Sequence, residues 1–384
     1  MLRRGRSTAA VSVALVAVLV SACSSADEAG VQGGDASELV AEMQSVLDQA
    51  SGEPEFKAPG PELDASQLSG KTVAIIGIDL RVPAIAEVAE SAQDVAEQAG
   101  LETTVFDAQG NASMVRQGLS QAIDGKVGAI LSVGLVVDLI HEQIVEAKDA
   151  GIPMVDVINT PPDADAPGQG SDPDMFGNVA PDSAAVGRLL AATAIVQTDG
   201  DADVAIMNTS ELTVAPTIVG AMHDTLDECE ACEYSDTDTA LVDWSTELPN
   251  QASSVLRSDP NVNFMLPIYD AMTLFASTGV RQAGGTGKVQ MASFNGTAPA
   301  LELVADGDIA TANVAQNNDW AAWAAIDQAM RGMLDLDPAD PVLPVRYVTT
   351  DDLDGVDTSS QSAVNEALFG TGYRQGYLEL WGLA

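Results

Sequence analysis

Between residues 71 and 333, short apolar runs alternate repeatedly with longer stretches whose apolar positions have helical spacing. The runs "TVAIIGI", "GAILSVG" and "NFMLPI" are apolar almost throughout, which indicates strands buried on both faces. Such strands, joined by helices, are typical of parallel sheets with helices on both sides. Because the runs are too many for one ordinary open sheet, the sequence predicts an α/β fold of two doubly wound parallel-sheet lobes joined by a hinge.

The alternation also gives boundaries for the two lobes. We expect an N-terminal lobe formed by residues 70–179 together with 317–345. The C-terminal lobe should consist of residues 180–316 together with 346–384. In doubly wound sheets ligands bind outside the carboxyl ends of the strands, so a cleft between two such lobes would have strand ends on both sides.

The first residues resemble an export signal rather than part of the fold. Arg3, Arg4 and Arg6 precede an apolar stretch that is shorter than the roughly 18–20 residues of a spanning helix. The stretch ends in "VSAC", which resembles a bacterial lipobox. We therefore expect residues 1–22 to be a lipoprotein signal peptide and Cys23 to carry a lipid that anchors the protein to the extracytoplasmic face of the cell membrane. The alternative is a plain secretory signal with an incidental cysteine.

Residues 23–69 have a different composition from the rest of the chain. Ser, Gly, Asp, Glu and Pro predominate, except within "SELVAEMQSVLDQA", where Leu39, Met43 and Leu47 recur at helical spacing. The segment "GEPEFKAPGPELD" that follows is rich in Pro and Gly. We interpret the whole region as a tether between lipid and lobe, with one short helix packed on the outside.

The charge of the chain is strongly unbalanced. It has 16 Lys and Arg residues against 57 Asp and Glu residues, which gives a formal net charge of −41. Such acidity argues against binding to nucleic acid and against electrostatic attraction to anionic lipid headgroups. It suits a solvated surface in a salty or extracellular environment, and it does not identify a substrate.

The two cysteines beyond the signal region, Cys229 and Cys232, lie in the stretch "CEAC". In an oxidising compartment such a pair most simply forms a disulfide. A zinc site would need two more ligands, for which His141 and His223 are the only histidines. A redox-active pair would follow a strand and open a helix, whereas this pair follows a helical stretch and precedes a strand. We expect a structural disulfide, no metal site and no cofactor.

Polar and aromatic residues gather directly after the predicted strands. They are Asp79, Arg81, Asp107, Asn159, Thr160, Asn208, Thr209, Ser210, Asp243, Trp244, Tyr269, Asp270, Asn295, Gly296, Thr297 and the run "QNNDW" that begins at Gln316. Amides and hydroxyls can donate and accept hydrogen bonds, and an indole suits the flat apolar face of a sugar ring. These positions are therefore the candidates for a ligand site in the expected cleft.

Several stretches follow the order found in type I periplasmic binding proteins, especially the ribose and sugar group of transporter substrate-binding proteins. They include "GKTVAIIG", "DAQGNASMVRQGLSQAI", "AGIPMVDV", "VDWSTELPNQASSVLRSDPNV", "YDAMTLFASTGVRQAG" and "SFNGTAPALELVADGDIATANVAQNNDW". The chain resembles this family over about residues 71–333. The resemblance implies two lobes joined by three hinge strands, with a sugar held between them.

The resemblance also implies roles for single residues. Trp244 matches the aromatic residue that stacks on the sugar ring, although it could instead pack within its lobe. Asn295 stands where the family has an aspartate that accepts from sugar hydroxyls, or it is a turn residue before a glycine. Gln316 matches a hinge glutamine that contacts the ligand. Tyr269 stands where the family often has asparagine, directly before Asp270.

Other positions depart from the pattern of the family. Ile158 and Asn159 replace an Asp-Arg pair, and an arginine expected near Thr217 is absent. Asp79 and Arg81 follow the first strand, where Arg81 either supplies the missing cation or is a surface residue. A site built on amides with few charges indicates a neutral ligand.

Together these features predict an exported, lipid-anchored receptor that delivers a small neutral polar molecule, a sugar or polyol, to the permease of an ABC importer. The alternative is a sensor that presents its ligand to a membrane signalling receptor. An enzyme is disfavoured because the sequence shows no nucleophile–base pair of a known kind. We expect a monomer that closes on its ligand in the cleft.

Overall fold

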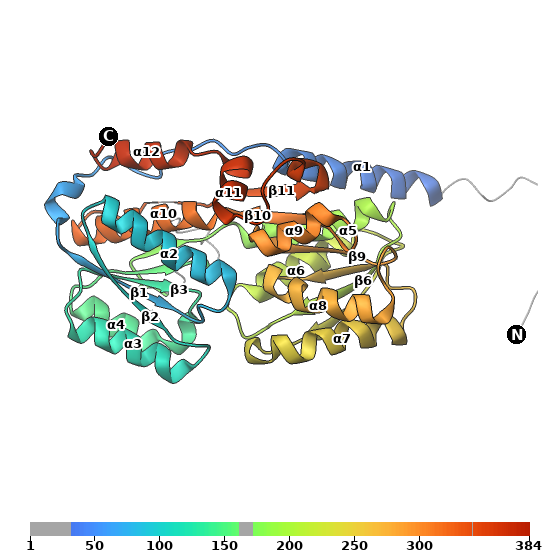
Figure 1. Cartoon of the computed structure of the whole chain (residues 1–384), viewed down its shortest axis with the longest axis horizontal. Coiled ribbons are helices and arrows are strands. Elements are labelled where there is room, and N and C mark those ends of the chain that lie inside the picture. Colours follow the sequence, from blue (N-terminus) through green and yellow to red (C-terminus); the bar gives the residue numbers. More distant parts are fainter. Residues whose placement is uncertain (1–31, 161–171, 340) are drawn as a thin grey trace, which may run out of the picture.

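The computed structural model describes residues 32–160, 172–339 and 341–384. Two lobes lie side by side along the longest axis of the molecule, and each contains one sheet covered by helices (Figure 1). The predicted α/β architecture of two parallel-sheet lobes is confirmed. In the described part of the chain no helix is both long and apolar enough to cross a membrane, and no cluster of acidic, histidine or cysteine side chains could hold a metal ion.

The sheet of the N-terminal lobe has the order β2-β1-β3-β4-β5, and every neighbouring pair is parallel. Its strands are β1 (Thr72–Gly77), β2 (Glu102–Asp107), β3 (Ala129–Val133), β4 (Met154–Val157) and β5 (Gly177–Val179). The central strands β3 and β4 are completely buried, as their apolar sequences predict.

Helices cover both faces of this sheet. On one face α2 (Pro83–Gln98) packs against α10 (Asn318–Met333) over β1 and β3, and on the other α3 (Ala112–Asp124) contacts α4 (His141–Asp149). Local signals explain where these helices begin, since α2 has a proline in its first turn and the Asn111 side chain accepts from two backbone N–H groups of α3.

The sheet of the C-terminal lobe has the order β11-β10-β9-β8-β6-β7. All neighbours are parallel except β11, which runs antiparallel to β10 at one edge. The strands are β6 (Asp203–Asn208), β7 (Glu233–Asp238), β8 (Phe264–Pro267), β9 (Gln290–Asn295), β10 (Ala310–Gln316) and β11 (Val345–Thr349). Strand β7 ends at Asp238, and the chain then forms the short 3-10 helix η3 (Leu241–Asp243).

The helices of the C-terminal lobe pack in pairs, with α5 against α6 and α7 against α8. They are α5 (Ser183–Gln197), α6 (Ala215–Leu226), α7 (Trp244–Ser258), α8 (Asp270–Ala283), α9 (Ala298–Asp306) and α11 (Gln361–Phe369). The remaining short 3-10 helices of the molecule are η1 (Ala65–Leu68), η2 (Val137–Leu139) and η4 (Thr350–Leu353).

The end of the chain differs from the expected lobe boundaries. Residues 346–384 were expected in the C-terminal lobe, and β11 and α11 do lie there, but α12 (Gly372–Leu380) packs on α10 in the N-terminal lobe (Figure 1). Aromatic stacking holds α12 on α10. The Tyr373 ring stacks on Trp320 at 4.6 Å between centroids, and Trp381 stacks on Trp323 at 5.3 Å. These rings complete the core of the N-terminal lobe.

The described part of the expected tether is also more tightly packed than a linker. Helix α1 (Gln32–Ala50) lies against α5, with Met43 and Leu47 buried in the core of the C-terminal lobe, so the expectation of a helix packed on the outside fits. Further on, Leu63 and Leu68 are buried in the N-terminal lobe. Residues 51–69 are therefore part of the fold. The signal peptide and Cys23 lie outside the described residues.

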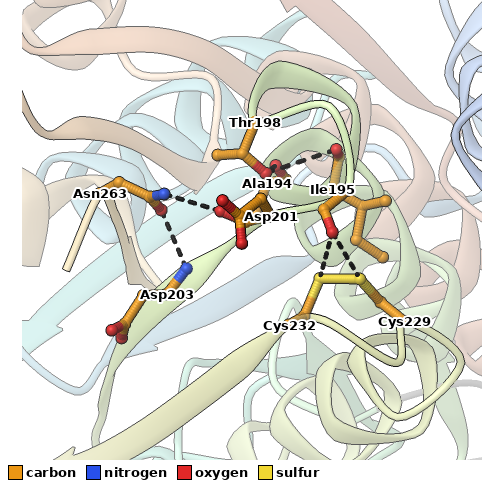
Figure 2. The surroundings of a disulfide bond; sticks show 9 residues. Ala194, Ile195, Thr198, Asp201, Asp203, Cys229, Cys232 and Asn263 are labelled. Carbon is orange, nitrogen blue, oxygen red and sulfur yellow. Dashed lines mark hydrogen bonds between the residues drawn. A yellow bond between two sulfur atoms is a disulfide. The ribbon is translucent and has the colours of Figure 1, made fainter. Parts of the chain in front are cut away.

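Cys229 and Cys232 are joined by a disulfide in the loop between α6 and β7, shown in Figure 2. The Cys229 sulfur lies 3.3 Å from the carbonyl oxygen of Gly200, a contact rather than a hydrogen bond because a disulfide carries no S–H. The loop therefore packs on the turn after α5.

Candidate ligand-binding cleft

A cavity that we call the inner cavity lies between the lobes. It is lined by Ile78, Val82, Ala84, Ile85, Gly134, Ile158, Asn159, Leu212, Leu241, Trp244, Tyr269 and Asn295. Many of these residues directly follow the carboxyl ends of strands, from β1 and β4 in one lobe to β8 and β9 in the other. The strand ends of both sheets thus meet at one cavity, where doubly wound folds place their ligands.

Asn295 is the residue of the inner cavity that is freest to bind a ligand. It ends β9 with a φ of 141°, a conformation that residues other than glycine rarely adopt, and it is 9% exposed. Its side-chain amide has no hydrogen-bond partner among the described residues, although the neighbouring positions are packed. An unused amide held on a strained backbone can donate and accept hydrogen bonds with a ligand.

A second strained residue lines the same cavity. Ile158 has a φ of 58°, which is an outlier for a β-branched side chain, and its N–H donates to Val179 of β5. Backbone strain of this kind persists only where surrounding contacts hold it, and it concentrates at ligand-binding sites. Two strained positions on opposite lobes therefore point to the same cavity.

Two aromatic residues form the wall of the inner cavity on the C-terminal lobe. The rings of Trp244 and Tyr269 lie 6.2 Å apart, and both residues are less than 10% exposed. The indole Nε1–H of Trp244 donates to the carbonyl of Thr239 at 3.2 Å, and burial raises the pKa of the Tyr269 phenol. Trp244 therefore packs within its lobe and also lines the cavity, so its two sequence interpretations are compatible.

Asn159 connects the two lobes at the same place. Its Nδ2 donates to the carbonyl of Leu135 in its own lobe and to the Thr213 hydroxyl of the other lobe at 3.2 Å. The side-chain oxygen is left to accept from a ligand. The structure thus brings together four of the predicted site residues: Asn159, Trp244, Tyr269 and Asn295.

The fold and this cleft have counterparts among known proteins. A family model described as "Periplasmic binding protein domain" matches residues 73–333. The chain belongs to the type I periplasmic binding proteins. This is a family of solute-binding proteins of sugar ABC transporters rather than of enzymes, and it is extracytoplasmic. No curated protein matches the chain.

Several solved structures of periplasmic binding proteins share the fold. A protein from Actinobacillus succinogenes with bound D-allose is 21% identical over 74% of this chain and 99% of its own, with a TM-score of 0.66. One from Bacillus halodurans with bound myo-inositol is 19% identical over 75% and 97%, with a TM-score of 0.67. The 5-methylthioribose transporter protein from Thermotoga lettingae is 16% identical over 77% and 93%, with a TM-score of 0.68.

Other predicted site residues lie away from the inner cavity of this periplasmic binding protein. Arg81 forms a two-pronged ion pair with Asp79, with its Nε 2.8 Å from one carboxylate oxygen, and its side chain is 73% exposed. Burial raises the pKa of the Asp79 carboxyl, but the hydrogen bonds and the charge of Arg81 outweigh burial, so the pKa is lowered. Thr217 lies half-buried in α6. None of the three lines the cavity, so their direct role in binding has no support in the geometry.

Asp270 lies behind the inner cavity, where its buried side chain accepts several hydrogen bonds, and it does not line the cavity. Its buried carboxylate accepts from the Ser293 hydroxyl at 2.7 Å, from Asn313 Nδ2 at 2.6 Å and from the backbone N–H and hydroxyl of Thr297 at 2.7 and 2.9 Å. These bonds join α8, β9 and β10 around the loop that carries Asn295. Asp270 therefore positions the cavity without lining it.

Gln316 belongs to a buried network at the hinge where β10 leads into α10. Its Nε2 donates to the side chain of Asn318 at 2.7 Å, and Asn318 in turn donates to Glu87 of α2 at 2.7 Å. The other oxygen of Glu87 accepts from Asn365 of α11, also at 2.7 Å. Gln316 thus acts at the hinge between the lobes and does not line the described cavities.

Glu87 makes the hinge network sensitive to pH. Burial raises its pKa from 4.5 to about 7, although the hydrogen bonds from Asn318 and Asn365 lower it, while Asp319 and Glu90 raise it further. Because the folded protein binds this proton more tightly than the unfolded chain, the gain in stability is complete below about pH 4.5 and is lost as the pH rises through about 7.

We therefore expect the free energy of unfolding of the wild type, relative to Glu87→Gln, to fall between pH 5 and pH 7 by at most about 3 kcal/mol. Urea denaturation at several pH values measures this difference. The matched control is Glu97→Gln, which changes an exposed carboxylate of the same helix that does not shift the pKa of Glu87. If the difference in the free energy of unfolding between the wild type and Glu87→Gln does not change with pH, the Glu87 carboxyl is not held neutral at the hinge.

The sequence did not single out the aliphatic residues of the cleft. Ile78, Leu212 and Leu241 follow β1, β6 and β7 and line the cavity from both lobes. Their signal in the sequence was weak, because Ile78 simply continues the apolar run "TVAIIGI", and nothing local distinguishes Leu212 or Leu241 from other aliphatic residues near strand ends. Aliphatic residues directly after several strands of one predicted sheet edge are what could have revealed them.

Proposed function

We propose that this chain is a lipid-anchored, extracytoplasmic solute-binding protein of an ABC importer, and that it binds a small neutral polar molecule, a sugar or polyol, in the inner cavity. The observation that carries the proposal is the side-chain amide of Asn295, which has no partner within the described part of the chain. It lies on a strained backbone, opposite Asn159, where the strand ends of both lobes meet. Among the residues that the structure describes, none that lines the inner cavity is charged, which favours a neutral ligand.

The ligands of structural neighbours support the class of molecule. The neighbours described above contain D-allose and myo-inositol or bind 5-methylthioribose, and we refer to these three as the reference solutes. The proposed mechanism is closure on the ligand, in which the bound molecule contacts both lobes and so favours the closed form that a permease would recognise.

Native mass spectrometry of the purified protein tests the proposal directly. We expect a ligand of small mass to remain bound through purification, and its mass identifies it. Titration of the reference solutes should raise the melting temperature of the ligand-free protein, since a ligand that binds only the folded state stabilises it. A protein that carries no ligand and responds to none of a wide panel of sugars and polyols would contradict the proposal.

Replacing Asn295 by glycine should separate binding from folding. Glycine accepts the φ of 141° without strain, so we expect the free energy of unfolding to stay within about 1 kcal/mol of the wild type. The affinity for the ligand should fall by roughly 1–3 kcal/mol because a ligand hydroxyl loses its partner. Isothermal titration measures the affinity and urea denaturation the stability. Unchanged affinity would remove Asn295 from the site.

The lipid anchor is tested by Cys23→Ser, which removes the sulfur that would carry the lipid. We expect the wild type in the membrane fraction and the variant in the soluble extracytoplasmic fraction, because acyl chains are then the main attachment to the membrane. Fractionation followed by immunoblotting gives the distribution. If the variant still sediments with membranes, another segment holds the protein there and the lipobox interpretation is wrong.

A further inference from the structure

A second cavity lies beside the inner cavity between the two lobes, and we call it the outer cavity. Ile78, Leu212 and Leu241 line both cavities, so the two lie next to each other at these side chains. The outer cavity is lined by Ile78, Gly110, Ala112, Val115, Val136, Leu139, Ile140, Glu211, Leu212, Leu241 and Val242.

The outer cavity offers almost nothing to a hydroxyl group. Of the described residues that line it, all except Gly110 and Glu211 carry an aliphatic side chain, and the Glu211 carboxylate accepts from the backbone N–H of Leu241. A polyhydroxylated molecule in this space would leave its hydroxyls without partners, which is costly. An alkyl or aryl group would instead remove these side chains from water.

Contacts between the loops hold the aliphatic side chains in place. The loop that carries Leu212 is tied to the end of β7 because the N–H and hydroxyl of Ser210 donate to Asp238, at 2.7 and 2.9 Å. The bond from Leu241 to Glu211 joins the same two loops a second time. The apolar wall on the C-terminal lobe is therefore built into the fold before any ligand arrives.

The mouth of this cavity exposes apolar surface to solvent. Leu139 of the N-terminal lobe is 56% exposed, and Val242 of the C-terminal lobe is 68% exposed. The two lobes approach closely here, since a Cβ at Gly110 would lie 3.7 Å from Val242 Cγ1. Exposed aliphatic residues on both sides of a cleft, next to a candidate ligand cavity, are typical of a binding surface rather than of chance exposure.

We propose that the ligand of this cleft carries an apolar substituent, and that the outer cavity binds this substituent while the inner cavity holds a small polar head. The class of ligand is thus an amphipathic small molecule, such as an alkyl or aryl glycoside, rather than a free polyhydroxylated sugar. The inference rests on the proposed function only in placing a small-molecule ligand between the lobes.

A series of alkane-1,2-diols tests the inference without knowledge of the natural head group. Ethane-, butane-, hexane- and octane-1,2-diol share one small polar end and differ only in the length of the apolar chain. Each methylene that enters the outer cavity should lower Kd by up to about fourfold, which corresponds to ~0.8 kcal/mol per buried CH₂. Ligand-observed NMR and isothermal titration of the full-length protein measure Kd.

Two variants test whether the dependence of Kd on chain length arises in the outer cavity. The double change Leu139→Ser and Val242→Ser alters exposed side chains of the outer cavity and should flatten the dependence of Kd on chain length. Val105→Ser is the matched control, because Val105 is also an exposed aliphatic residue (38%) but lies on β2 and lines neither cavity. This control should keep the dependence of the wild type.

The outcomes separate the inference from the proposed function. A Kd that does not change with chain length, or a dependence that persists in the double variant, overturns the inference. If the reference solutes bind while the diols show no such dependence, the sugar-binding proposal stands and the apolar subsite is wrong. If the diols show the dependence and no sugar or polyol binds, the subsite stands and the sugar proposal fails.

Discussion

Replacing Asp327 by alanine should lower the free energy of unfolding by about 3–5 kcal/mol, because it leaves a buried guanidinium without its counter-charge. Asp327 and Arg331 are both fully buried, one turn apart on α10. Arg331 Nε donates to the Asp327 carboxylate at 2.7 Å, and the same carboxylate accepts from the indole of Trp381 at 2.8 Å. Arg331 also donates to the carbonyl of Pro61 at 2.9 Å.

This pair joins three parts of the chain that are far apart in sequence: helix α10, the residue after α12 and the segment before η1. Urea denaturation measures the loss. The double variant Asp327→Leu and Arg331→Met is the control, since it removes both charges and should recover much of the stability. A loss below about 1 kcal/mol for Asp327→Ala would mean that water reaches the guanidinium and satisfies it.

Replacing Trp244 by alanine should have a large effect on both folding and binding. The family resemblance implied either a residue that stacks on the ligand or one that packs within its lobe. The indole is 4% exposed and belongs to the core of the C-terminal lobe. We therefore expect a loss of roughly 3–5 kcal/mol in the free energy of unfolding. The ligand should also bind about 30-fold more weakly, because the cavity loses an aromatic wall.

A variant at a second tryptophan separates the loss of stability from the loss of affinity. Trp323 is similarly buried in α10 but lines neither cavity, so Trp323→Ala should lower stability by a comparable amount and leave the affinity unchanged. Affinity is measured by isothermal titration under conditions where circular dichroism shows both variants to be folded. If Trp244→Ala keeps the affinity of the wild type, the indole serves only to pack the lobe.

The architecture could be predicted because it depends on short-range patterns. Apolar strands such as β3 and β8 must be covered on both faces wherever they lie. The helices between them can be recognised from the helical spacing of their apolar residues and from the prolines and capping residues at their ends. The edge strands β5 and β11 were not predicted. β5 is only three residues long and β11 is only partly buried, so neither has a distinct apolar pattern.

The site was predicted in part, because the position of a residue after a strand fixes its edge of the sheet but not the direction of its side chain. Asn295 and Tyr269 do line the inner cavity. Asp270 directly follows Tyr269, but its side chain points into the lobe and binds Ser293 and Asn313. Arg81 is similarly close in sequence to Ile78, yet it pairs with Asp79 and is exposed.

The sequence by itself thus determined the two sheets, their parallel strands and the edge at which a ligand would bind, since burial and helical periodicity are local properties of the chain. Only the tertiary structure decided which residues meet across the cleft. Helix α12 crosses back to the N-terminal lobe because its rings stack on Trp320 and Trp323. Leu212 and Leu241 form one apolar wall because Glu211 joins their loops. Contacts of this kind depend on distances between remote segments, which no spacing along the chain records.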